Sequence, residues 1–208
     1  LRFMGGFLFM IVVALVAAVV GAYPRAGFVL DGFSYPDDFH DSAYGHPDGR
    51  GPGTGTALRD RLIGREREIS RHLSAIRAKI APRIPAPVVS VSGLHLSDAV
   101  AIAGLADYYV CHAGTLQHKI GWIHDVPGMV HTNRAGLTAG AARWAADQVE
   151  GGVPPTFVEP ALIDDLSIVR TVRAVERNRD YRFADIRALV SCILKDMARQ
   201  LPGLGEPP

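Results

Sequence analysis

Short apolar runs alternate with longer amphipathic stretches along the chain. The runs of strand length lie at 26–30, 87–92, 107–112, 128–131 and 156–159. Between and after them, apolar residues recur every three or four positions, which is the period of a helix. This pattern predicts helices at 57–80, 95–104, 115–124, 135–149, 162–177 and 183–201. Strands that alternate with helices predict an α/β fold, a Rossmann-like parallel sheet with helices on both faces.

The N-terminal residues 3–22 are all apolar or Gly. A run of about 20 such residues is long enough to span a bilayer, and Val20-Gly21-Ala22 resembles a signal-peptidase site. The same run also fits a buried helix that leads directly into the strand at 26–30. Periodicity does not separate these interpretations, so both a membrane anchor or signal and a buried helix remain open. The compartment is accordingly either the cytoplasm or a membrane.

Composition adds limited constraints. The chain has 208 residues, 48% of them hydrophobic, and 22 basic against 21 acidic side chains. That hydrophobic share is typical of a globular core, and the small net charge gives no indication of nucleic-acid binding. We expect an apolar segment at 1–24, a Rossmann-like nucleotide-binding domain at 25–201 and a loose tail at 202–208. Residues 34–56, rich in Gly, Pro, Asp and His, predict a long loop.

Polar residues concentrate where the strand at 107–112 ends. In a parallel sheet the carboxyl ends of the strands share one edge, and ligands bind outside that edge. Here a Gly allows a tight turn, a Thr can cap the following helix, and the helix start attracts anions. The residues expected to contact a phosphate or diphosphate are Gly114, Thr115, Gln117 and Lys119.

The next predicted strand ends in His131-Thr132-Asn133, which we expect beside the first turn. Two neighbouring turns with so many polar groups exceed what packing requires. His112 and His131 are therefore the candidate catalytic residues, as a general base or as contacts to a leaving group. Thr132 and Asn133 are candidates to hold a ribose or a phosphate.

Asp31 and Ser34 follow the strand at 26–30 and are expected to face the same ligand, although Asp before Gly is also an ordinary turn signal. The chain has eight histidines. None of those in the 112–131 stretch forms the i, i+4 pair of a helical zinc site. We therefore expect no bound metal. Cys111 and Cys192 lie in separate predicted elements and indicate no disulfide framework.

The stretch Asp107–Trp122, followed by Val126–His131, resembles the donor side of GT-B glycosyltransferases. It is similar to the turn of family-61-type enzymes, with His112 and Gly114 at the matching positions. The second Gly and the Asn of that family are replaced here. The resemblance implies the C-terminal, donor-binding lobe of a GT-B fold, a nucleotide-sugar donor as substrate, and a metal that is retained or absent depending on the family. We expect no separate cofactor. The resemblance also implies an acceptor hydroxyl of unknown identity and an acceptor lobe outside this chain.

Two functions from different classes follow. The first is a glycosyltransferase, or the donor lobe of one, that transfers a sugar from a nucleotide diphosphate to a hydroxyl. The second is a non-catalytic, membrane-anchored α/β domain that binds a small ligand or a partner. The apolar run at 3–22 favours the second function, and so does the lack of a strong catalytic motif.

Overall fold

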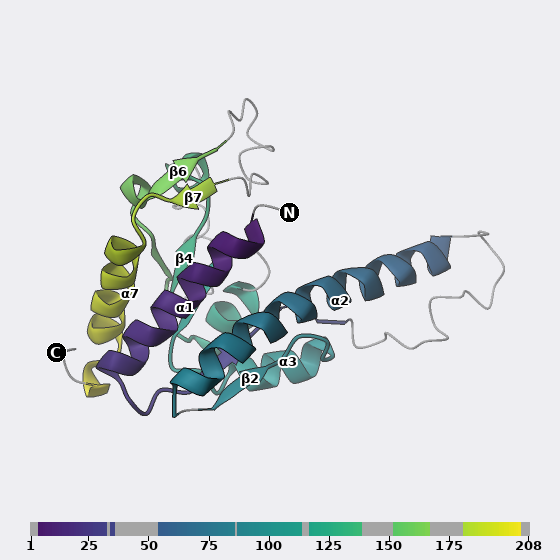
Figure 1. Ribbon diagram of the computed structural model, residues 1–208, viewed down its shortest axis with the longest axis horizontal. Helices are drawn as coiled ribbons and strands as arrows, with labels where there is room; N and C mark the ends of the chain where they lie inside the picture. The colour runs from purple at the N-terminus through teal and green to yellow at the C-terminus, as the bar shows by residue number, and fades with distance from the viewer. Residues whose placement is uncertain are drawn as a thin grey trace. The chain divides into compact units, whose positions relative to one another are not determined.

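The protein has a mixed α/β fold with small parallel sheets and helices (Figure 1). The computed structural model describes residues 4–32, 34–35, 54–85, 87–113, 117–138, 152–166 and 181–204. Contacts divide the chain into two compact units. Unit 1 comprises Leu1–Pro24 and Gly104–Pro208, and unit 2 comprises Arg25–Ala103. Whether residues 25–201 behave as one domain stays a prediction.

Unit 2 is built on two parallel strands and a long helix. β1 (Phe28–Leu30) pairs with β2 (Val88–Ser90). The connection between them contains α2 (Thr54–Ile80), which packs near β2 and buries Ile76 and Ile80 near its C-terminal end. A short 3-10 turn at Ala81–Arg83 ends α2 at a Pro, which cannot continue an α-helix. α3 (Leu96–Ala103) follows β2, close to the predicted bounds.

Unit 1 contains a parallel sheet in the order β3-β4-β5. Its strands are β3 (Tyr109–His112), β4 (Gly128–His131) and β5 (Thr156–Phe157). The central strand is the most buried part of this sheet, since Met129 and Val130 are both 0% exposed. A strand that is covered on both faces has a continuous apolar sequence. The run at 128–131 has that character, and its predicted bounds are confirmed.

Two helices of unit 1, α1 (Met4–Ala22) and α7 (Ile186–Gln200), lie side by side (Figure 1). α1 buries Ile11, Val16 and Val19, as the buried-helix interpretation expects. Within the described part of the chain, no helix has both the length and the apolar content that a membrane crossing needs.

Helix α7 has a well-defined N-terminus. The Asp185 carboxylate accepts hydrogen bonds from the amides of Arg187 and Ala188 at 2.8 and 3.0 Å, which satisfies two of the unpaired donors of the first turn. One face of the helix, formed by Leu189, Ile193 and Met197, is buried, and α7 contacts β4. The helix therefore covers the sheet with this face.

A buried carboxylate joins α7 to the amino-end side of the sheet. Asp196 is 5% exposed and accepts hydrogen bonds from the Tyr108 hydroxyl at 2.6 Å and the Thr156 hydroxyl at 3.0 Å. Arg199 forms an ion pair with the same carboxylate. Burial, followed by the hydrogen bond to Asp196, raises the pKa of Tyr108. A buried charge is tolerated when it is paired in this way.

The predicted helix at 162–177 is wrong at its start. A 3-10 turn (Pro160–Leu162) is followed by β6 (Ile163–Asp165), which pairs antiparallel with β7 (Tyr181–Phe183). Ile163 and Phe183 are partners in this ladder and both are buried. Three residues are too few for periodicity to distinguish a strand from a helix, so pairing with β7 decides the conformation. The helix predicted at 183–201 accordingly starts later, at Ile186.

The described strands do not all pair in one sheet, so the α/β class is confirmed and the Rossmann-like sheet stays a prediction. β1 pairs only with β2, the strands β3, β4 and β5 form a second sheet, and β6 with β7 forms a third, antiparallel one. The apolar pattern identifies strands but does not specify their neighbours. Of the predicted helix at 135–149, the structure describes 134–138 as helical. The rest of that helix and the loop at 36–53 lie outside the described residues.

Candidate functional site

The strand ends that carry the two candidate catalytic histidines lie side by side. β3 and β4 are parallel, and His112 is the register partner of His131. The Ala113 amide donates to the His131 carbonyl at 2.8 Å, which extends the pairing one residue past the strand. The two imidazole rings are 5.7 Å apart and nearly perpendicular. The structure thus brings together the two histidines that the sequence selects.

Two aromatic residues of β7 complete this cluster. Tyr181 stacks on His112 with ring centroids 6.0 Å apart, and Phe183 meets the edge of the His131 ring at 5.2 Å. The Tyr181 hydroxyl lies 2.6 Å from Nδ1 of His131. We call His112, His131, Tyr181 and Phe183 the histidine–aromatic cluster. The sequence analysis missed the two β7 residues, although their aromatic side chains at alternating positions are typical of a strand.

His131 is a poor base in this environment. Burial, and secondarily the nearby His112, lower its pKa to about 3. The ring is therefore neutral at neutral pH, and it takes up a proton only in strong acid. Because a hydroxyl can donate or accept, either tautomer of the neutral ring can form this hydrogen bond with Tyr181. His131 is consequently suited to orient a neighbour or a ligand, and less suited to the general-base role expected for it.

The tautomer of His112 follows from its hydrogen-bond partner. Its Nδ1 lies 2.6 Å from the backbone carbonyl of Ala113. Because a carbonyl oxygen only accepts hydrogen bonds, Nδ1 carries the proton and Nε2 is the basic nitrogen. An imidazole held by its own backbone in one tautomer is arranged as proton-transfer groups usually are. Between the two histidines, His112 is therefore the better candidate for a base.

In the turn after β4, three backbone amides are hydrogen-bonded to side chains of the protein. Asn133 is 0% exposed, and its side-chain oxygen accepts the Gly136 amide. The Asp165 carboxylate from β6 accepts the amides of Arg134 and Ala135 at 2.7 and 3.2 Å. These three amides start the helix at 134–138, and two side chains cap them. Asn133 thus acts as a helix cap, and its expected contact with a ribose or phosphate stays a prediction.

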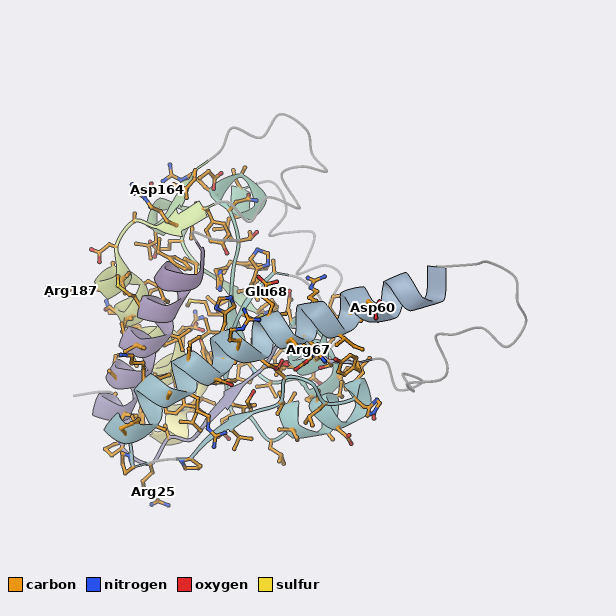
Figure 2. All side chains as sticks on the ribbon, turned by 45° about the vertical axis from the view of Figure 1, so that its right-hand side comes forward. Arg25, Asp60, Arg67, Glu68, Asp164 and Arg187 are labelled. Carbon is orange, nitrogen blue, oxygen red and sulfur yellow. The ribbon has the colours of Figure 1, made fainter. Side chains whose placement is uncertain are left out.

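Arg134 fastens this turn to β6. Its Nε donates to the carbonyls of Ile163 at 2.7 Å and Pro160 at 3.1 Å. Its guanidinium also lies 3.4 Å from the carboxylate of Asp164, which Figure 2 labels. Thr132, the first residue after β4, is 1% exposed. The segment after β4 is therefore held rigidly, which fixes the position of His131 at the end of the strand.

The segment after β3 contains a π-helix at His118–Trp122. Such wide turns are rare and occur often at functional sites. Gln117 immediately precedes it, is 2% exposed, and its Nε2 has no hydrogen-bond partner among the described residues. Lys119 lies on the π-helix and is partly exposed. Gly114 and Thr115, the expected phosphate contacts of this turn, lie outside the described residues.

Asp31 and Ser34 belong to unit 2, whereas the histidine–aromatic cluster belongs to unit 1. Asp31 accepts the Gly32 amide at 2.6 Å, which is the turn role considered for it. A Cβ on Gly32 would lie 2.9 Å from the Ser92 hydroxyl, in the turn after β2, so a larger residue does not fit there. The expectation that Asp31 and Ser34 contact the ligand of the histidines stays a prediction.

Neither cysteine forms a disulfide. Within the described ranges, no group of three or more His, Cys, Asp or Glu side chains is arranged to hold a metal ion. Comparisons with protein-family models, with curated proteins and with solved structures found no match. Any functional assignment therefore depends on the geometry of the strand ends.

Proposed function

We propose that unit 1 binds a nucleotide-diphosphate sugar at the carboxyl edge of the β3-β4-β5 sheet, as the donor lobe of a glycosyltransferase. The observation that carries the proposal is the pairing of two parallel strands that end together in His112 and His131. Ligands of parallel α/β sheets bind outside this edge. The π-helix that follows β3 adds support, since it carries Lys119 a few residues after His112 in the chain.

The residues divide the chemistry between them. Transfer forms a bond between the acceptor oxygen and the anomeric carbon and breaks the bond from that carbon to the phosphate oxygen. The acceptor hydroxyl loses its proton to Nε2 of His112. Negative charge develops on the diphosphate as it leaves, and the Lys119 ammonium stabilises it. His131, neutral and fixed by Tyr181, orients the donor through a hydrogen bond.

A second candidate is a non-catalytic, membrane-anchored α/β domain that binds a small ligand or a partner. The apolar N-terminal run, of which the structure describes α1, favours it, although no described helix is long and apolar enough to cross a membrane. A helix that is apolar on every side is either buried in protein or held in a membrane. In this alternative, the sheet edge binds its ligand without chemistry.

A calorimetric titration tests the donor site. The full chain is titrated with UDP, GDP, CDP and the matching nucleotide sugars. At least one should bind, and at 100 times its Kd it should raise stability by about 2.7 kcal/mol. Lys119→Ala should weaken binding by about five- to tenfold with little change in Tm. Lys79→Ala, an exposed residue of α2, is the control and should not change binding.

Two outcomes would contradict the proposal. If no nucleotide diphosphate binds at millimolar concentration, the site is not a donor site. If Lys119→Ala lowers stability as much as it lowers affinity, the turn is structural. A third outcome would favour the non-catalytic candidate. In that case the chain binds a nucleotide sugar but transfers no sugar to any added acceptor, and His112→Gln binds the nucleotide sugar as the parent does.

A further inference from the structure

Helices α1 and α7 leave a cavity of about 480 Å³ between them. This volume is within the range of about 300–1,000 Å³ that is typical of small-molecule sites. The cavity lies within unit 1 and is separate from the histidine–aromatic cluster. The residues that line it are Ala14, Ala18, Ile186, Arg187, Val190, Ser191, Leu194 and Lys195.

The sequence explains why the two helices leave this space. On α1 the wall is formed by Ala14 and Ala18, which are one turn apart and carry only a methyl group. On α7 it is formed by Ile186, Val190 and Leu194, again spaced by one turn. These differ from the residues of α7 that are buried against the rest of the unit. α7 thus has a second apolar face, which small side chains of α1 leave only partly covered.

Two cations border this apolar space. Arg187 and Lys195 both line the cavity, and both residues are exposed. They are eight residues apart on one helix, which places them about 12 Å apart along its axis. Figure 2 labels Arg187 on α7. None of the described residues that line the cavity is acidic, so its apolar lining is bordered by two positive charges.

We propose that this cavity binds a long-chain fatty acid. The alkyl chain lies along Ala14 and Ala18 against the apolar face of α7, where its burial provides most of the affinity. The carboxylate pairs with Arg187 or Lys195 at the rim, and charge complementarity of this kind selects an anion over an uncharged amphiphile. The proposal is independent of the donor site, because it uses other residues and another ligand.

The test uses the full chain, oleate below its critical micelle concentration and isothermal titration calorimetry. Oleate should bind saturably and with one molecule per chain, and oleyl alcohol should bind more weakly. The double variant Arg187→Gln/Lys195→Gln should bind oleate about five- to tenfold more weakly and leave oleyl alcohol unchanged. The matched control is Arg65→Gln/Lys79→Gln, which removes one Arg and one Lys from exposed positions of α2 and should bind as the parent does.

A second variant tests the cavity itself. Ala14→Leu/Ala18→Leu fills the space and should abolish oleate binding, provided that its circular dichroism spectrum and Tm show a folded chain. The proposal is overturned if oleate does not bind, or if the charge variant and its control bind oleate equally. It is also overturned if the chain binds vesicles of phosphatidylglycerol but not monomeric oleate, because the cations would then recognise a lipid surface.

Discussion

His112 and His131 occupy equivalent register positions on adjacent strands, yet their chemistry differs. Nδ1 of His112 donates to a backbone carbonyl, whereas Nδ1 of His131 shares a hydrogen bond with the Tyr181 hydroxyl. His112 therefore has its basic nitrogen at Nε2, whereas either nitrogen of the neutral His131 ring can carry its proton. The difference arises from the hydrogen-bond partners, which are the Ala113 carbonyl for His112 and the Tyr181 hydroxyl for His131. The sequence around each histidine does not predict these hydrogen bonds.

The low pKa of His131 predicts a pH-dependent stability. The folded ring has a pKa of about 3, against 6.5 for the ordinary side chain. Between these values the unfolded chain binds more protons than the folded chain, so stability falls as pH is lowered. The contribution is complete above pH 6.5 and is lost toward pH 3, with a slope of up to about 1.4 kcal/mol per pH unit.

Urea denaturation between pH 3.5 and 7.5 measures this slope. His131→Gln should flatten the profile over that interval, whereas His72→Gln, at an exposed position of α2, should leave it unchanged. An equal slope in the parent and in His131→Gln would show that the His131 ring is not protected from protonation.

At the level of elements, the helix that starts at residue 134 is capped by a carboxylate from strand β6. Asp165 accepts two backbone amides there, whereas its neighbour Asp164 makes exposed ion pairs of 3.4 Å with Arg134 and Arg182. The two acids are adjacent in sequence, so their substitutions form a matched pair. Asp165→Ala should lower the free energy of unfolding by about 1–2 kcal/mol, and Asp164→Ala by less than about 1 kcal/mol.

Chemical denaturation of the two variants decides this prediction. Equal losses, or a larger loss for Asp164→Ala, would mean that the cap from β6 does not hold the turn after β4. In that case the fixed position of His131 would need another explanation.

The sequence predicts an element correctly where helical periodicity or a long apolar run is clear. It fails where pairing with a distant strand determines the conformation. The long amphipathic helix α2 follows from its periodicity, and strand β4 follows from the apolar run that ends at His131. β6 lies at the start of the helix predicted at 162–177, and its pairing with β7 makes it a strand. For the same reason Tyr181 and Phe183 could not be assigned to the site, although the adjacency of His112 and His131 could.

Across the whole of unit 1, the Asp196 carboxylate connects α7 with the residues that begin or precede two strands of the sheet. Its substitution leaves the Tyr108 hydroxyl and the Thr156 hydroxyl without this acceptor. Asp196→Ala should therefore lower the free energy of unfolding by about 3 kcal/mol. Ser191→Ala, at an exposed position of α7, should change it by less than about 0.5 kcal/mol.

Thermal and urea unfolding of both variants measure the difference. A loss below about 1 kcal/mol for Asp196→Ala would show that this network does not hold α7 against the sheet. Tyr108→Phe provides an intermediate point, with an expected loss of about 1–2 kcal/mol because it removes one hydrogen bond.

At this scale the central claim is that the carboxyl edge of β3 and β4 binds a nucleotide diphosphate. The most direct measurement is an NMR titration of the imidazole signals, assigned with His→Gln variants, as the nucleotide that binds in calorimetry is added. The signals of His112 and His131 should shift saturably, and that of His72 in unit 2 should not. A nucleotide that binds without moving either the His112 or the His131 signal would place the site elsewhere and contradict the account.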